Sequence, residues 1–62
     1  MNEFILQWFD DDKNIWIQAK YYIKNNRYYQ KYDFSDGTGK KARRISEAKF
    51  VNAFLEFIAP DI

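Results

Sequence analysis

The segment best suited to bind an anionic group is the basic run Lys-Lys-Ala-Arg-Arg at residues 40–44, with four cations in five positions. Ammonium and guanidinium groups at this density contact phosphates or acidic protein surfaces. The run directly precedes an expected helix, whose first backbone N–H groups also favour anions. A solvated loop is the alternative interpretation. The run is nevertheless the first candidate for an anionic partner.

A second candidate region, residues 16–31, mixes aromatic rings with basic groups. Aromatic rings stack on bases and cations neutralise phosphates in nucleic-acid-binding proteins. Trp, Tyr and Arg are also the common hot spots of protein interfaces. Both regions together give one set of candidate binding residues: Trp16, Lys20, Tyr22, Lys24, Arg27, Tyr29, Lys31, Lys40, Lys41, Arg43 and Arg44.

The sequence lacks residue types that commonly catalyse reactions or bind metal ions. The sequence has no histidine and no cysteine, which removes the familiar triads and the common zinc sites. The acidic run 10–12 lacks the spacing, glycine and distal glutamate of a calcium loop, so we interpret it as an acidic turn. We expect no catalytic residue, no cofactor and no bound metal.

Charge is distributed unevenly along the 62 residues. The net charge is only +1, but residues 18–49 hold nine basic and three acidic groups, a local charge of +6. Residues 1–17 carry −3 and residues 50–62 carry −2. A nearly neutral chain thus has a basic centre, which favours an anionic partner.

Two features indicate the compartment. The chain has no cysteine, which suits a reducing environment, and residues 1–3 lack the basic start and apolar run of a signal peptide. The longest apolar run is interrupted by Glu56 and is far shorter than the roughly 20 residues that span a bilayer. We expect a cytoplasmic protein without membrane contact.

The elements that must position these residues follow from periodicity. Period-two alternation of β-branched and aromatic residues predicts strands near 3–9, 14–24 and 27–34. Residues 40–45 form either a short fourth strand or an extended basic loop. Apolar residues at three- and four-residue spacing predict a helix over 46–58. One face of this helix is expected to carry Phe50, Val51, Phe54, Phe57 and Ile58, with Ser46 as N-cap and Pro60 ending the element.

These elements predict a single α+β domain spanning 1–62, in which an antiparallel meander of three or four strands packs on one C-terminal helix. A 62-residue chain is too short for two domains.

Strand register groups the candidate residues. A two-residue turn at Asn25-Asn26 pairs Tyr22 with Tyr29 as exposed neighbours, on the side of the sheet that carries Trp16. The other side is expected to be continuously apolar and covered by the helix. The same turn sets four pairs on the aromatic and basic side: Lys24–Arg27, Tyr22–Tyr29, Lys20–Lys31 and Gln18–Asp33. Opposed like charges destabilise a free sheet, so an anionic partner would account for them.

The first turn is less sharply defined. A four-residue turn over 10–13 is expected to bring the first strand beside the second, with Trp8, Leu6 and Phe4 next to Ile15, Ile17 and Ala19.

Residues 27–54 resemble the small DNA-binding module found at the N-terminus of many tyrosine-type integrases of mobile elements. The resembling features are the aromatic strand 27–32, the turn 36–37, the basic run 40–44 and the Ser-Glu-Ala start of a helix at 46–48. The resemblance covers less than half of the chain. It implies a sheet that lies in the DNA major groove.

Three functions remain open from the sequence. The leading hypothesis is a non-enzymatic module that binds nucleic acid, with DNA favoured over RNA. The alternative is a small protein-binding inhibitor or adaptor, of the kind that phages and mobile elements encode against a host protein, acting through the same residues. A homodimer formed through an edge strand or the aromatic face is the third.

Overall fold

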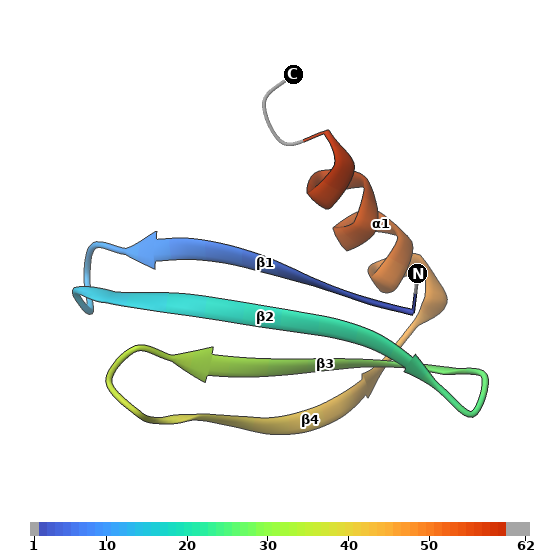
Figure 1. Ribbon diagram of the computed structural model, residues 1–62, viewed down its shortest axis with the longest axis horizontal. Coiled ribbons are helices and arrows are strands. Elements are labelled where there is room, and N and C mark those ends of the chain that lie inside the picture. The colour runs from blue at the N-terminus through green and yellow to red at the C-terminus, as the bar shows by residue number, and fades with distance from the viewer. Residues whose placement is uncertain (1, 60–62) are drawn as a thin grey trace.

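Four antiparallel strands and one helix make up the computed structural model, which describes residues 2–59. The strands lie in sequence order, so the sheet is a meander with β1 and β4 at its edges (Figure 1). This confirms the α+β prediction, and residues 40–45 belong to a fourth strand. The elements are β1 (Glu3–Asp10), β2 (Ile15–Lys24), β3 (Arg27–Phe34), β4 (Gly39–Ile45) and α1 (Glu47–Ile58).

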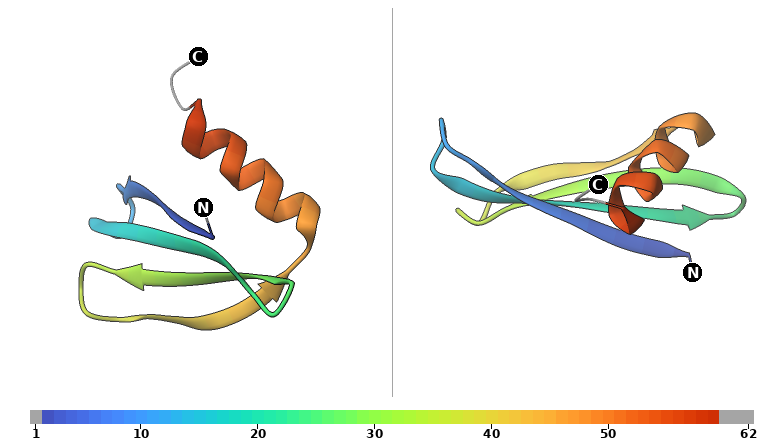
Figure 2. Two further views of the ribbon diagram at one scale, coloured as in Figure 1. Left: turned by 45° about the vertical axis from the view of Figure 1, so that its right-hand side comes forward. Right: turned by 90° about the horizontal axis from the view of Figure 1, so that it is seen from above.

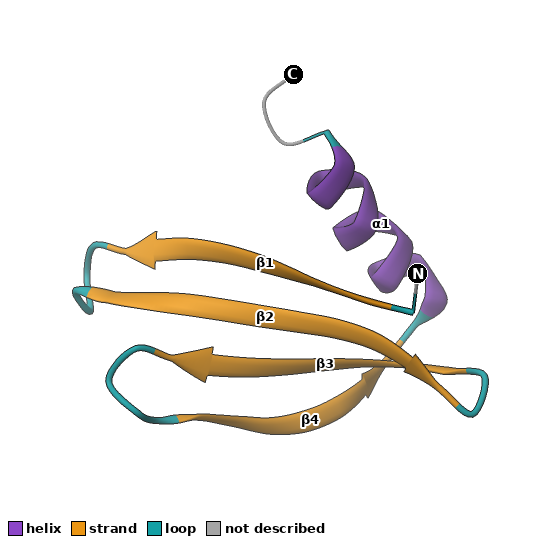
Figure 3. Cartoon of the chain, in the orientation of Figure 1, coloured by secondary structure: helices purple, strands orange, loops and turns teal. Residues whose placement is uncertain are grey.

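Asparagines with positive φ lie in two of the three hairpin connections, Asn14 between β1 and β2 and Asn25 and Asn26 between β2 and β3. Figure 3 draws these connections as teal loops. Asn25 and Asn26 have φ of 53° and 62°, the pattern of a type I′ hairpin turn. In the β1–β2 connection, the Asp10 carboxylate accepts hydrogen bonds from the backbone N–H groups of Asp12 (3.0 Å) and Lys13 (3.2 Å). Asp10, the first residue of the acidic run 10–12, therefore stabilises the turn between β1 and β2.

The β2–β3 register is the predicted one, from Lys24–Arg27 through Gln18–Asp33. The β1–β2 register is shifted by two residues from the prediction, since Trp8 pairs with Ile17 and not with Ile15. The reason is that Asp10 still belongs to β1 and pairs with Ile15, so the turn occupies 11–14. An even shift keeps every side chain on its predicted face.

The core forms where α1 crosses one end of the sheet (Figure 2). Phe4 is its centre and is only 5% exposed. Its ring centroid lies 5.1–5.5 Å from those of four other aromatic rings, so β1, β2 and α1 meet around one side chain. These neighbours are Tyr21, Phe50, Phe54 and Phe57.

The helix face that meets the sheet differs from the predicted one. Phe50 and Ala53 are buried and Phe54 is half-buried, but Val51 and Ile58 are 45% and 56% exposed. Apolar residues occupy so much of the circumference of α1 that their spacing is compatible with two overlapping choices of the side that packs on the sheet. Ser46 is the N-cap as predicted, its Oγ accepting from the Lys49 backbone N–H at 3.1 Å. Pro60, the predicted stop signal, lies outside the described residues.

The helix-covered side of the sheet also contains a polar centre, so the expectation of a continuously apolar surface was wrong. Gln30 is 2% exposed. Its Nε2 donates to the hydroxyls of Tyr21 (2.7 Å) and Tyr32 (3.1 Å), and its Oε1 accepts from Arg43 Nε (3.1 Å). Because its amide group is bonded at both ends, it can be buried without a large penalty.

This network predicts a loss of stability at alkaline pH. Burial raises the pKa of Tyr21 above its ordinary value of about 10, partly opposed by the hydrogen bond from Gln30. The neutral phenol is thus favoured by folding, and its contribution is complete below pH 10 and lost as pH rises through the folded pKa. Urea midpoints measured from pH 8 to pH 11 should fall above about pH 10. Tyr21→Phe should flatten this fall, and an equally steep fall in that variant would contradict the assignment to Tyr21.

Candidate binding surface

The side of the sheet away from α1 carries most of the candidate residues, and we call it the open face. Register places candidates from β2, β3 and β4 on it, because residues paired across strands share a side. Its candidate members are Trp16, Lys20, Tyr22, Lys24, Arg27, Tyr29, Lys31 and Arg44.

Tyr22 and Tyr29 form a stacked pair at the centre of the open face. Their ring centroids are 5.3 Å apart with an interplanar angle of 18°. Lys20 Nζ lies 5.9 Å from the centroid of Tyr22, so this ring already contacts both Tyr29 and a cation. Both rings are half-buried instead of fully exposed, because each shields the other. Tyr29 is consequently the better placed of the two to stack on a partner.

Two lysines of the open face have acidic neighbours. Lys20 Nζ lies 3.3 Å from Glu3 Oε2, and Lys31 Nζ lies 2.6 Å from Asp33 Oδ1. The opposed pair Lys20–Lys31 is therefore compensated within the chain and requires no external anion. Exposed pairs of this kind contribute at most about 1 kcal/mol each. The argument from opposed like charges now applies only to Lys24 and Arg27, beside the hairpin turn.

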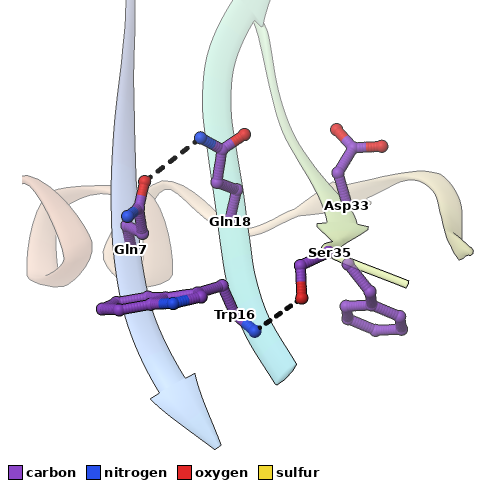
Figure 4. Close-up of a pocket in the computed structure, with 6 residues that line it drawn as sticks. Gln7, Trp16, Gln18, Asp33 and Ser35 are labelled. Carbon is purple, nitrogen blue, oxygen red and sulfur yellow. Dashed lines mark hydrogen bonds between the residues drawn. The ribbon is translucent and has the colours of Figure 1, made fainter. Parts of the chain in front are cut away.

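Trp16 lies at the other end of the open face and is 49% exposed. It lies six positions before Tyr22 along β2, a distance of roughly 20 Å in an extended strand. Its ring meets Phe9 edge-on at 5.4 Å, and its backbone N–H and C=O are both bonded to Ser35 at 2.9 Å. Figure 4 shows the Trp16 ring extending toward Gln7, whose Oε1 accepts from Gln18 Nε2 at 3.2 Å. The sequence grouped Trp16 with the tyrosines, whereas the structure separates them.

Around Trp16 the surface forms a shallow depression of about 280 Å³. Two aromatic rings, two amides, a hydroxyl and one carboxylate line it, without any basic group. Such a lining suits a polypeptide better than a phosphate. The lining residues are Gln7, Trp16, Gln18, Asp33, Phe34 and Ser35.

The basic run on β4 is divided between the two sides of the sheet. Lys40 pairs with Tyr32 and Arg43 with Gln30, so both lie on the helix-covered side, whereas Arg44 pairs with Tyr29 on the open face. A register irregularity between Gln30 and Tyr32 interrupts the alternation. We call Lys40, Lys41, Arg43 and Arg44 the basic edge.

On the helix-covered side, three cations of the basic edge converge. Lys40, Lys41 and Arg43 line a depression of about 310 Å³ together with Gln30 and Tyr32. The hydrogen bond from Arg43 Nε to Gln30 holds this guanidinium in place. The sequence singled out the cations but not Gln30. Its place on the helix-covered side, among aromatic residues, was the signal that it would be buried.

Comparison with known proteins gave no match: no protein-family model, no curated protein and no solved structure corresponds to this chain. The resemblance to integrase modules thus gains no support from these comparisons. Within residues 2–59, no helix has the length and apolar composition needed to cross a bilayer. The same residues contain no group of three or more His, Cys, Asp or Glu side chains placed to hold a metal ion.

Proposed function

We propose that this protein is a non-enzymatic DNA-binding module that contacts phosphates through its basic edge. The observation that supports this most is the placement of cations on both sides of one edge strand. β4 contains no acidic residue, and within residues 2–59 none of its four cations lies within ion-pair distance of a carboxylate. All four side chains are exposed.

The dimensions of DNA fit such an edge. The major groove is about 12 Å wide and admits a β-ribbon, and a sheet with its side chains is about 10 Å thick. If β4 enters the groove, Lys40 and Arg43 face one phosphate backbone, and Arg44 faces the other. Tyr29, next to Arg44 on the open face, supplies an aromatic ring at the same edge.

Edge protection is the competing explanation of these charges, since lysines on an edge strand prevent pairing with other chains. That explanation would apply equally to the other edge. β1, however, carries no basic residue and has exposed apolar side chains. The asymmetry between the two edges favours a binding role for the basic edge.

A salt series tests the proposal. The protein should bind an unrelated duplex with sub-millimolar affinity at about 50 mM salt, and the plot of log affinity against log salt should have a slope near −3.6 for four phosphate contacts. Binding should be tighter to duplex than to single strands. Absence of binding to either at this salt concentration would overturn the proposal.

The Trp16 depression supports a second candidate, binding of a host protein as an inhibitor or adaptor. This end of the open face combines an exposed Trp with two amides, a hydroxyl and a single carboxylate, a composition low in charge like that of an interface centre. Trp16→Ala should then abolish capture of one host protein while leaving DNA affinity within about twofold. Equal loss of DNA affinity would instead assign Trp16 to the nucleic-acid surface. Either function fits the cytoplasmic location that the composition suggests.

A further inference from the structure

Two depressions adjoin on the helix-covered side of the sheet. The first is the one of about 310 Å³ in which Lys40, Lys41 and Arg43 converge, and we call it the cationic depression. The second, of about 240 Å³, lies near the β1–β2 connection, away from the end of the sheet that α1 crosses (Figure 1), and we call it the aromatic depression. Tyr32 and Lys40 line both, so the two depressions share a wall. The aromatic depression is lined by Trp8, Lys13, Ile17, Tyr32, Phe34 and Lys40.

A register irregularity forms the cationic depression. Lys40 and Arg43 are three residues apart, so regular alternation would place them on opposite sides of the sheet. Lys40 instead pairs with Tyr32 and Arg43 with Gln30, and these two partners lie on the same side of β3. Such irregularities redirect side chains and are common beside functional sites. Here the result is a cluster of cations on one side of an edge strand.

Gln30 determines where the free protons of this cluster lie. Arg43 can only donate, so the bond from its Nε at 3.1 Å fixes Gln30 Oε1 on that side. Gln30 Nε2 therefore faces the two tyrosines and donates one N–H to the hydroxyl of Tyr21 and the other to that of Tyr32, at 2.7 and 3.1 Å. A hydroxyl that accepts here keeps its own O–H for another acceptor. Within residues 2–59, the O–H of Tyr32 has none.

The cationic depression therefore offers donors to an anion. The terminal nitrogens of Arg43 and the ammonium groups of Lys40 and Lys41 make no ion pair or side-chain hydrogen bond within the described range, 2–59. The Tyr32 O–H adds a neutral donor. A phosphate monoester carries a charge of about −1.5 to −2 at pH 7 and three acceptor oxygens, whereas a phosphodiester inside a strand carries a single charge. Three cations and a hydroxyl thus match a terminal phosphate better than an internal one.

The aromatic depression lies where the group attached to such a phosphate would reach. Trp8 meets Tyr32 edge-on, with ring centroids 6.3 Å apart and an interplanar angle of 88°. An edge-on contact covers at most one face of the indole, and Trp8 is 41% exposed, so part of its ring surface is open. Phe34 stacks on Tyr32 at 6.4 Å and adds a third ring, and nucleic-acid bases stack on side chains of this kind. A carboxylate, that of Glu56, also approaches Trp8, but it lines a separate depression.

We propose that the two depressions together bind a nucleoside 5′-phosphate, either free or at the end of a DNA strand. The phosphate occupies the cationic depression and the base stacks in the aromatic one. Lys13 and Lys40 line the aromatic depression and donate to the nitrogen and carbonyl acceptors of a base, which a plain phenyl ring lacks. The site deepens the proposed function, since it rests on phosphate binding by the basic edge.

Three small molecules test whether the depressions act together: adenosine 5′-monophosphate, ribose 5-phosphate and adenosine. Affinities come from amide shifts of the ¹⁵N-labelled wild type at about 50 mM salt. The monophosphate should bind about tenfold more tightly than ribose 5-phosphate, because stacking adds to the phosphate contacts. It should also bind more tightly than adenosine. Equal affinities for the monophosphate and either fragment, or no binding of the monophosphate, would overturn the proposal.

Two variants separate the depressions. Trp8→Ala should weaken binding of the monophosphate about tenfold and leave that of ribose 5-phosphate unchanged. Tyr32→Phe keeps the ring and the charge but removes the free O–H, so it should weaken the binding of both ligands several-fold. Matched controls on the open face are Trp16→Ala and Tyr29→Phe, which should change neither affinity. Controls that weaken binding as much as their counterparts would contradict the site.

DNA ends separate this site from the proposed function. A short duplex with 5′-hydroxyl ends tests binding by the basic edge alone, and the same duplex with 5′-phosphates tests the site. A gain in affinity with the phosphates, abolished by excess monophosphate, assigns the site to strand ends, whereas no gain with the monophosphate still bound assigns it to the free nucleotide.

The remaining outcomes each overturn one claim. Binding of the hydroxyl duplex without binding of the monophosphate overturns the nucleotide site alone, and the reverse result overturns DNA binding alone. Tighter binding of phosphotyrosine than of the monophosphate would assign the site to a phosphorylated peptide and would overturn the nucleotide site as well.

Discussion

Replacing Phe4 with alanine should unfold most of the protein at room temperature. Phe4 is 5% exposed and is the ring around which Tyr21, Phe50, Phe54 and Phe57 pack. Removing a buried phenylalanine ring costs about 3–5 kcal/mol, which is comparable with the entire stability of many small domains. Urea unfolding followed by circular dichroism measures this directly. The effect should exceed that of Phe54→Ala, since Phe54 is only half-buried.

Phe9→Ala is the matched control for this prediction. It makes the same change on the same strand, but Phe9 is 40% exposed and, among residues 2–59, its ring meets only that of Trp16. It should cost less than half as much as Phe4→Ala. Equal losses in the two variants would mean that the core is not centred on Phe4.

Neutralising the basic edge should strongly weaken the binding of duplex DNA, and this is the second-largest effect that we expect. Changing Lys40, Lys41, Arg43 and Arg44 to alanine removes up to four phosphate contacts. Duplex affinity at about 50 mM salt should fall at least 100-fold, and the salt slope should flatten by up to about 0.9 per lost contact. Salt-dependent titrations with one duplex measure both quantities.

Two controls separate local contact from net charge and from folding. A variant with Lys13, Lys20, Lys31 and Lys49 changed to alanine loses the same total charge at other positions and should retain most of the slope. A second variant keeps Arg43, and thus its hydrogen bond to Gln30, while Lys40, Lys41 and Arg44 become alanine. This second variant should still lose most of the slope of log affinity against log salt. Equal slope losses in the two charge-matched variants would exclude the basic edge as the phosphate contact.

The sequence predicted the elements and one register well, for identifiable reasons. Asn25 and Asn26 specify a two-residue turn because asparagine tolerates positive φ, and that turn fixes every β2–β3 pair. The β1–β2 connection contains several polar residues that can begin or end a turn. Asp10 is a strand residue because it pairs with Ile15 across the sheet, and polar residues around the turn do not specify that pairing.

The candidate surface was harder to predict because it depends on tertiary geometry. Ordinary alternation places Arg43 and Arg44 on opposite sides of the sheet, but the register irregularity between Arg43 and Lys40 brings Lys40 to the side of Arg43, and the spacing of basic residues does not reveal it. The partner of Lys20, Glu3, could not be found either, because it depends on the β1–β2 register. For α1, the abundance of apolar residues left the buried stripe ambiguous, and Val51 and Ile58 were assigned to the wrong side.

The most direct test of the central claim is a titration of the ¹⁵N-labelled protein with duplex DNA at about 50 mM salt, followed by backbone amide shifts. The account predicts that the largest shifts fall on Lys40, Lys41, Arg43 and Arg44 and spread to Tyr29, while Val51, Leu55 and Ile58 stay nearly unchanged. Spectra that do not change at all, or changes confined to the surroundings of Trp16, would contradict the assignment of the basic edge as a DNA-binding surface.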